Sequence, residues 1–403
     1  MRRRSLVAAL PVGLVVLSAC VREDPEAGAP AAASPVQDPT PVVRGEQAPV
    51  VDPAELRLPL EMTPMIVVDP GWTSTPLELD GIFLGYRDDQ DQLRYIAVDQ
   101  DGTILWEADR PLSCTGFTLT RGAEDTPVAV LADLAPAEDA VAAMTLTAYD
   151  LRTADEVWGP IDAPGPQAGV GLVFAAPSDA PMGETGPRSA LSGSTGEVSL
   201  VDADLADGRI LAEHLGTILC TEGAELLALS IEGEELWRLP MPTGIDPLRA
   251  RVLGAIDTNT SFAVIADQES AGVVLDLSQG SVIADEALRV ARDHVLEITV
   301  VASGSTVRGL DIDGVEQWTH DDPEELDLIS AGERLAYAVR RGEGTLVVLD
   351  TNRGLMVNPY DVDLEGPLAV PEVFSAETAA AVRIEEKRCL VTTAFDENYG
   401  LRE

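Results

Sequence analysis

The chain has 403 residues, of which 45% are hydrophobic, and its 69 acidic residues outnumber 27 basic ones to give a formal net charge of −42. The hydrophobic fraction is sufficient for a large buried core and excludes global disorder. A surface this acidic repels phosphate backbones, so we expect no nucleic-acid partner, whereas cations and basic partners would be attracted.

The amino terminus has the three parts of an export signal. Residues 1–4 are a positively charged start, residues 5–17 are a short apolar run, and small residues precede Cys20. This arrangement resembles the bacterial lipobox, which implies cleavage before Cys20 and attachment of lipid to its thiol. We therefore predict a signal peptide over residues 1–19 and a protein held by lipid on the extracytoplasmic side of the cell membrane. An ordinary secretory signal or an uncleaved anchor is the alternative.

Proline, alanine and acidic residues dominate residues 20–60. Such a composition buries little apolar surface and cannot offset the entropy of the chain. We therefore predict that the lipidated Cys20 is followed by a disordered tether to residue 60, and that the folded domain spans residues 61–398.

Three cysteines remain once Cys20 is assigned to lipid, namely Cys114, Cys220 and Cys389. An exported location permits one disulfide, and a bridge from Cys114 to Cys389 would join the first and last repeats. Sequence spacing leaves their pairing open.

A hairpin unit recurs from residue 64 onward, where short aliphatic or β-branched runs alternate with turns. An apolar strand ends in Asp or a small residue, a polar turn follows, and a second strand carries a large apolar residue. The strand-ending residues of the seven copies are Asp99, Asp150, Leu191, Ser230, Asp276, Asp311 and Asp350. Their spacings of 51, 41, 39, 46, 35 and 39 residues indicate one four-stranded sheet per repeat. Because a ring of blades lets every sheet bury both faces, we predict a single all-β propeller.

The second strand of each hairpin carries an apolar plug, seven or eight residues after the strand-ending position. The plugs are Trp106, Trp158, Val198, Trp237, Ile283, Trp318 and Val357. We predict that the four tryptophans dock neighbouring blades. A weaker hairpin at residues 379–393, with strands near residues 65–68 and 82–86 to complete the first blade or close the ring, leaves seven and eight blades open, and eight is preferred.

The copies with a tryptophan plug, such as residues 149–158, resemble the pyrroloquinoline-quinone-like propeller repeat. The resemblance covers most of residues 64–395 and implies a fold shared by quinoprotein dehydrogenases and by non-enzymatic lipoproteins, among them the outer-membrane-protein assembly propeller. Fold alone does not settle function. Quinoprotein dehydrogenases carry an adjacent cysteine pair, which this chain lacks. We therefore expect no quinone cofactor.

No catalytic, cofactor or metal residue is predicted. The acidic loops at residues 88–91, 99–102 and 311–314 lack the twelve-residue calcium pattern, and Asp and Gly are what tight hairpin turns require. The chain has no Gly-x-Ser-x-Gly elbow, no Cys-x-x-Cys pair and only three histidines.

These features predict a lipid-anchored propeller that binds a protein, a peptide or a cell-envelope polymer without acting as an enzyme. Two alternatives stay open: an extracellular enzyme of quinoprotein or hydrolytic type with its site in the central funnel, and a sensor or solute-binding lipoprotein that works with a membrane complex. The sequence identifies neither the ligand nor the oligomeric state.

Overall fold

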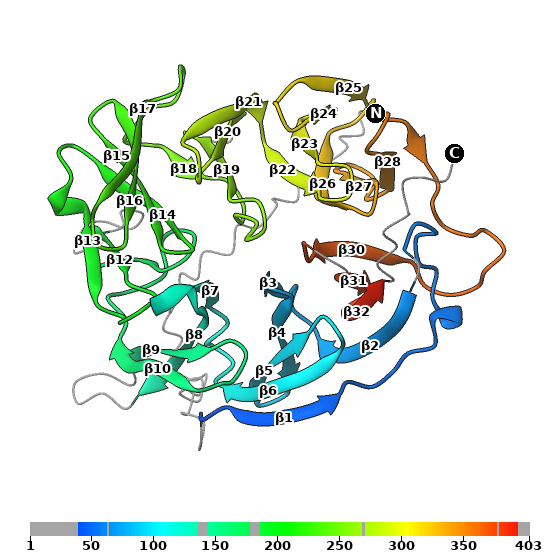
Figure 1. Ribbon diagram of the computed structural model, residues 1–403, viewed down its shortest axis with the longest axis horizontal. Helices are drawn as coiled ribbons and strands as arrows, with labels where there is room; N and C mark the ends of the chain where they lie inside the picture. Colours follow the sequence, from blue (N-terminus) through cyan, green and yellow to red (C-terminus); the bar gives the residue numbers. More distant parts are fainter. Residues whose placement is uncertain are drawn as a thin grey trace, which may run out of the picture. The chain divides into compact units, whose positions relative to one another are not determined.

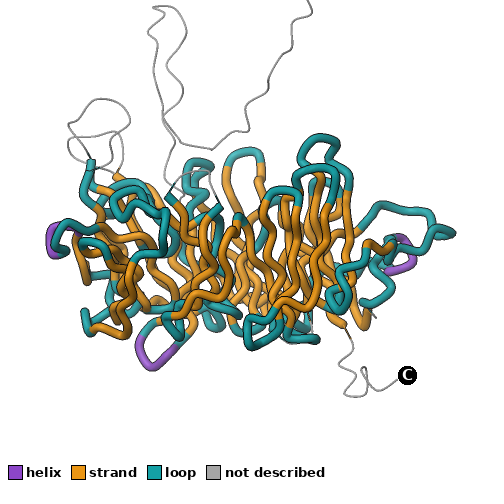
Figure 2. Tube along the Cα trace, turned by 90° about the horizontal axis from the view of Figure 1, so that it is seen from above, coloured by secondary structure: helices purple, strands orange, loops and turns teal. Residues whose placement is uncertain are grey.

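The computed structural model describes residues 39–62, 64–135, 143–177, 186–267, 271–376 and 379–393. They form eight antiparallel sheets that follow one another around a ring (Figure 1). The strands run between two faces made of turns and loops (Figure 2). The predicted all-β propeller is thus confirmed, with the preferred count of eight blades.

The first four blades follow chain order, with the first strand of each blade innermost. Blade 1 contains β3 (Leu77–Leu79), β4 (Ile82–Asp89), β5 (Gln92–Asp99) and β6 (Thr103–Arg110). Blade 2 contains β7 (Phe117–Arg121), β8 (Pro127–Ala135), β9 (Ala143–Asp150) and β10 (Glu156–Asp162). Blade 3 contains β11 (Val173–Ala175), β12 (Arg188–Leu191) and β13 (Val198–Val201). In place of a fourth, innermost strand this blade has a single β-bridge between Gln167 and Phe174. Blade 4 contains β14 (Arg209–His214), β15 (Thr217–Glu222), β16 (Glu225–Ser230) and β17 (Glu235–Pro240).

The next three blades continue the same order. Blade 5 contains β18 (Arg251–Val252), β19 (Phe262–Ala266), β20 (Gly272–Asp276) and β21 (Ser281–Ala287). Blade 6 contains β22 (Arg289–Asp293), β23 (Ile298–Ser303), β24 (Thr306–Leu310) and β25 (Glu316–Asp321). Blade 7 contains β26 (Leu326–Gly332), β27 (Leu335–Arg340), β28 (Leu346–Asp350) and β29 (Met356–Val357). Three short 3-10 helices lie at Pro53–Glu55, Ala123–Asp125 and Asp202–Asp204.

Blade 8 closes the ring by combining the two ends of the described chain. It contains β30 (Ala369–Phe374), β31 (Ala379–Ile384) and β32 (Lys387–Thr393), and its outer strand is β2 (Pro64–Trp72). In this sheet Val67 and Val68 pair with Val391 and Leu390. The strand expected near residues 65–68 therefore joins the last blade, and the one near residues 82–86 belongs to the first.

The hydrophobic core is divided among the blade boundaries. One buried cluster joins blades 1 and 2 around Trp106 and Leu131, another joins blades 6 and 7 around Trp318 and Ala338, and comparable clusters occupy the other boundaries. Each sheet therefore buries apolar side chains on both faces, as the ring arrangement requires.

The Asp at the end of the third strand caps its own hairpin turn. Asp99 Oδ1, for example, accepts hydrogen bonds from the backbone N–H groups of Asp101 and Thr103. The same type of turn cap is made by Asp150, Asp276, Asp311 and Asp350. In blade 3 this position is Ser192, one residue later than the sequence spacing indicates, because the Ser192 N–H bonds to the carbonyl of Glu197 across the turn.

Each of the four predicted docking tryptophans reaches the next blade with its indole N–H. The Nε1 atoms donate to backbone carbonyls just after the turn-capping position of that blade, at 2.8 Å for Trp106 to Leu151, 2.8 Å for Trp158 to Gly193, 2.7 Å for Trp237 to Leu277 and 2.6 Å for Trp318 to Thr351. A fifth tryptophan, Trp72, fully buried in β2, donates to the carbonyl of Ile96 in blade 1. The hydrogen bond across the closing boundary was not predicted.

Turn glycines receive three of these indoles. A Cβ atom on Gly196, Gly280 or Gly354 would lie 2.4–2.7 Å from the ring of Trp158, Trp237 or Trp318, and all three glycines have positive φ. An aliphatic plug leaves the next turn more open. At the boundary between blades 3 and 4 the plug is Val198, and a Cβ on the turn glycine of blade 4, Gly233, would meet nothing within 4 Å.

The expected tether is shorter than residues 20–60, because residues 39–60 are ordered against the propeller. β1 (Val42–Gln47) pairs with β6 as a fifth strand of blade 1. Leu56 and Leu58 are buried in a cluster with blade 8. These aliphatic residues offset the cost of ordering a proline-rich segment, and the composition of the whole stretch hides them. Cys20 and the predicted signal peptide lie outside the described residues.

The three remaining cysteines are free thiols, each buried in a different place. Cys114 packs between blades 2 and 3, Cys220 lies in β15 of blade 4, and Cys389 packs in blade 8. No bridge joins the first and last repeats. Burial raises the pKa of the Cys114 thiol to about 11 and that of Cys220 and Cys389 to about 12. None of the described helices is long and apolar enough to span a membrane.

The contact between Gly354 and Trp318 can be separated from the backbone effect of a glycine. Gly354→Ala and Gly344→Ala both place alanine at a φ near +70°, but only the first would meet an indole ring. We expect Gly344→Ala to lower the free energy of unfolding by about 1–2 kcal/mol. Gly354→Ala should cost about 1–3 kcal/mol more because of overpacking. Urea unfolding of the two variants measures the difference, and equal losses would contradict the docking role of Trp318.

Candidate functional site

A cavity of about 280 Å³ lies in the central channel, on the side of blades 1, 5, 6, 7 and 8. Its walls are largely apolar, formed by residues such as Leu253, Ile256, Leu328 and Phe374. A few polar groups converge on it from different blades: Glu78, Asp257, Asn259, Arg289, Arg292, His294, Ser330 and Glu372. Apolar walls with a small number of placed polar groups are typical of ligand sites.

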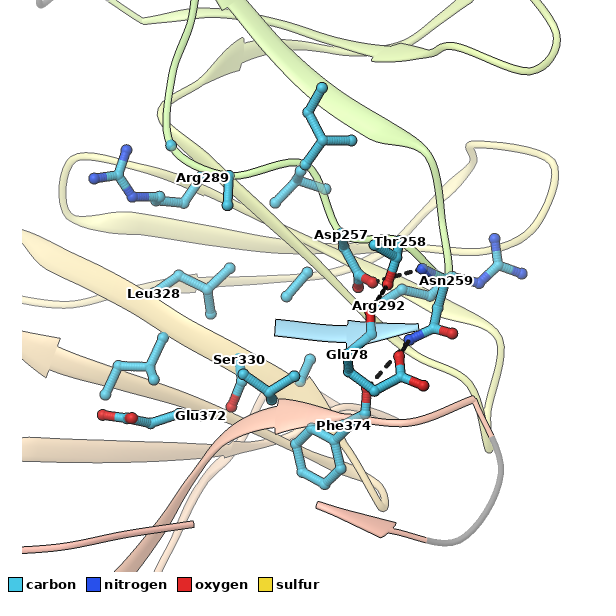
Figure 3. A pocket seen from close by; sticks show the side chains of 18 of the residues that line it. Glu78, Asp257, Thr258, Asn259, Arg289, Arg292, Leu328, Ser330, Glu372 and Phe374 are labelled. Atoms are coloured by element: carbon cyan, nitrogen blue, oxygen red, sulfur yellow. Dashed lines mark hydrogen bonds between the residues drawn. The ribbon is translucent and has the colours of Figure 1, made fainter. Parts of the chain in front are cut away.

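One loop crosses the channel and bounds this cavity at one end. Residues 253–261, called the crossing loop below, connect β18 to β19 in blade 5 and reach β3 of blade 1 (Figure 3). Thr258 Oγ1 donates to the backbone carbonyl of Glu78 at 2.5 Å. Asn259 Nδ2 donates to Glu78 Oε2 at 2.7 Å and to the carbonyl of Phe374 in blade 8 at 3.2 Å. The loop therefore links blade 5 to blades 1 and 8 across the channel.

Glu78 is a buried carboxyl group at this junction, with only 3% of its surface exposed. Besides Asn259, the backbone N–H of Gly81 donates to its Oε1 atom at 2.7 Å. Burial raises the pKa of Glu78 to about 7, against the opposing effect of these two hydrogen bonds. The carboxyl group therefore changes charge near neutral pH.

Asp257 and His294 form a second titrating pair on the channel wall. Asp257 faces the channel but is enclosed by the surrounding blades, and this desolvation raises its pKa, while the nearby His294 partly opposes the shift. Desolvation lowers the pKa of His294, and the negative charge of Asp257 acts in the opposite direction. An acidic group on the crossing loop, Asp257, and a basic group of blade 6, His294, therefore lie near each other on the channel wall.

The opposite end of the cavity has a different polarity. Glu372 in β30 is ion-paired with Arg383 at 2.9 Å and with Arg388 at 3.1 Å. Arg289 also lies at this end, while Arg292 lies near Asn259 at the other (Figure 3). The hydroxyl of Ser330 is already bonded to the carbonyl of Pro371. Among the groups at the two ends of the cavity, Arg289 and Arg292 retain the most N–H donors that no protein acceptor among the described residues uses.

None of these cavity residues was predicted as a site residue, although the sequence carries one signal for them. Glu78 and Gly81 have the same spacing as Glu213 and Gly216, and each glutamate is the last but one residue of the innermost strand of its blade. Glu213 is also buried, and it accepts hydrogen bonds from Gly216 N–H at 2.9 Å and from Thr120 Oγ1 in blade 2 at 2.7 Å. A Glu-x-x-Gly at the end of an inner strand therefore indicates a buried, inter-blade carboxyl group.

The channel does not suit the quinone cofactor and metal ion of quinoprotein dehydrogenases. Both oxygens of Glu78 already accept protein hydrogen bonds, and the amide of Asn259 presents its NH₂ group there because Nδ2 also donates to Phe374. A cation would require acceptor oxygens at this point. Within the described ranges no group of three or more His, Cys, Asp or Glu side chains could hold a metal ion.

Trp106, Trp158, Trp237 and Trp318 lie at blade boundaries and contribute nothing to the cavity lining. The residues predicted from the repeat therefore belong to the scaffold. The cavity is built instead by inner strands and by the crossing loop.

The raised pKa of Glu78 makes stability depend on pH. The folded state holds the proton on Glu78 more tightly than the unfolded state does. The resulting gain in the free energy of unfolding is therefore complete below pH 4.5 and is lost as the pH rises to about 7. The unfolding free energy of the wild type minus that of Glu78→Gln should fall by about 3 kcal/mol between pH 4.5 and pH 8. The exposed control Glu55→Gln should show no such change. A difference between wild type and Glu78→Gln that is constant with pH would refute the assignment.

Comparison with known proteins supports the repeat type. A family model described as outer membrane protein assembly factor BamB matches residues 222–394. Among solved structures, BamB from Moraxella catarrhalis is 12% identical with a TM-score of 0.46, over 83% of this chain and 98% of that chain. Sqt1 from Saccharomyces cerevisiae is 10% identical with a TM-score of 0.39, over 83% of this chain and 100% of that chain. The comparison with curated proteins finds no match. The chain thus forms an eight-bladed β-propeller, and residues 222–394, from blade 4 to blade 8, are similar to the family of outer membrane protein assembly factor BamB.

Proposed function

We propose that this protein is a lipid-anchored binding module that holds part of a protein, peptide or envelope ligand in the channel of its propeller. The observation that carries the proposal is the cavity bounded by the crossing loop, where apolar walls meet polar groups from several blades. A pocket assembled from a rigid ring is already formed before the ligand arrives, which reduces the entropy cost of binding.

The amino terminus supports a place in the cell envelope. The apolar run before Cys20 and the positive residues at the start have the export pattern described above. The matching family model is named for outer membrane protein assembly, an envelope process. A segment of proline-rich chain between Cys20 and β1 would act as a spacer between the lipid and the ring.

A hydrolytic enzyme is the second candidate, because one observation favours it. Glu78 changes charge near neutral pH, as a general acid or base must. Against this role, its two oxygens are occupied by Gly81 and Asn259, and its side chain is almost fully buried. Its contacts are better suited to holding the crossing loop in place.

The binding role can be tested in cells with a photoreactive residue. We expect benzoylphenylalanine at Ala255, an exposed residue of the cavity lining, to crosslink to one defined envelope component. The same residue at Val362, which is 77% exposed and outside the cavity, serves as the control. Crosslinks of equal yield and identity at both positions, or none at Ala255, would contradict a ligand in the channel.

The anchor is tested separately by fractionation and mass spectrometry. Cys20→Ala should move the protein from the membrane fraction to the soluble fraction, or leave it uncleaved, because no thiol is present to accept lipid. Ser34→Ala, a change in the predicted tether, should leave the protein in the membrane fraction. An intact mass of the wild type that corresponds to an unmodified amino terminus would overturn the lipid anchor.

A further inference from the structure

The boundary between blades 5 and 6 contains a second pocket, of about 650 Å³. At this boundary the plug is Ile283, where four of the other boundaries carry tryptophan. The facing turn glycine, Gly314, would meet only the carbonyl of Ile283 if it carried a Cβ, at 3.6 Å. The missing indole therefore leaves open space next to the turns of the two blades.

This pocket adjoins the channel cavity through three shared residues, Asn259, Arg292 and His294. Its remaining lining comes from the end of the crossing loop, from the β20–β21 turn and from the β24–β25 turn of blade 6, and it includes the carboxylates of Asp276 and Asp313. Its other polar side chains are Thr260, Ser278, Gln279 and Ser281. At its rim, Val282 and Ile312 are 46% and 63% exposed, so an apolar contact is available beside the polar floor.

Arg292 lies beside this pocket without an acidic partner. Many arginines on the ring are ion-paired, for example Arg238 with three glutamates and Arg341 with Glu325 and Asp327, whereas Arg292 belongs to those that are in no ion pair among the described residues. Arg292 is half-buried, and across the described part of the chain its guanidinium makes no ion pair or side-chain hydrogen bond. Its recorded contact is with the ring of Phe262, at 5.8 Å from the centroid. Its guanidinium carries five N–H donors and forms part of the pocket lining.

The charges around Arg292 restrict the ligand to one negative charge. Asp257 and Glu78 lie on the same side of the channel and would repel a dianion such as a phosphate monoester. Asp276 already uses Oδ1 to cap its own turn, through Ser278 and Gln279. A single carboxylate fits the fork of one guanidinium and leaves no net positive charge to attract a second.

The polar lining matches the backbone of a peptide. The side chains of Gln279 and Ser281 offer donors and acceptors such as peptide units need. Asn259 and Ser278, whose donors are engaged by Glu78, Phe374 and Asp276, offer acceptor oxygens. β21 is the outer strand of blade 5, so its far edge has unpaired backbone groups beside the pocket. An extended segment can therefore lie along this edge and place its end at Arg292.

We propose that the pocket between blades 5 and 6 binds the free C-terminal carboxylate of an extended peptide, with Arg292 as the carboxylate-binding residue. This inference rests on the proposed function as a binding module and names the chemistry of its partner. The crosslink from Ala255 tests the module, whereas the variants below test this pocket.

The test is fluorescence anisotropy with an N-terminally labelled peptide of five alanines and one C-terminal leucine. We expect saturable binding of the free acid to the whole protein, at least tenfold weaker binding of the C-terminal amide, and at least tenfold weaker binding of the acid to Arg292→Met. Arg353→Met, an equal change of charge at an exposed turn, should bind like the wild type.

A second variant blocks the pocket without removing a charge. Ile283→Trp places at this boundary the side chain that fills four others, and it should abolish peptide binding while the urea midpoint stays at or above that of the wild type. Octanoate, a carboxylate without peptide groups, should compete at least tenfold more weakly than the unlabelled peptide. Equal affinity of acid and amide, an unaffected Arg292→Met, or equal competition by octanoate would overturn the proposal.

Discussion

Every sheet of this protein is apolar on both faces, so each must be packed between two others and the series must close on itself. Closure depends on β2, which lies sixty residues or more ahead of most blades in the chain and yet supplies the outer strand of the last one. Trp72 at the end of β2 then bonds to blade 1. With this strand in place no sheet face is left unpartnered, and the channel wall becomes a fixed frame on which loops can be varied.

The residues that stabilise the ring and the residues that line its cavity lie in different parts of each blade. The strand-ending Asp residues cap the hairpin turns, and the tryptophan plugs pack on the next turn, so both act at the periphery of the blades. The inner strands and the crossing loop carry the polar groups of the cavity, such as Glu78 and Asn259. A change in one inner loop therefore alters the cavity while leaving the boundary contacts intact, which is how one propeller fold serves many ligands.

Much of the fold was predictable because its determinants are local. A turn-capping residue and a plug seven or eight residues later fall within one hairpin, and their recurrence near every forty residues fixes the blade count within one. The cavity was not predictable in the same way. Glu78 and Asn259 meet across the channel although they are 181 residues apart, and no periodicity relates an inner loop of blade 5 to one of blade 1. The tether was overestimated for a related reason, since Leu56 and Leu58 are buried only against blade 8.

The blade boundaries that depart from the repeat pattern are the ones that suggest a function. Where tryptophan occupies the plug position, the glycine of the next turn accepts the indole and the boundary is filled. Ile283 leaves that space open, and the arginine beside it is one that the surrounding acidic residues have not neutralised. In a chain of net charge −42, an arginine without an ion partner keeps its positive field only where carboxylates are held away from it or are already engaged, as Asp276 is by its own turn. At this boundary an open plug position lies beside an arginine without an ion partner, and this combination is the basis on which we propose a binding pocket there.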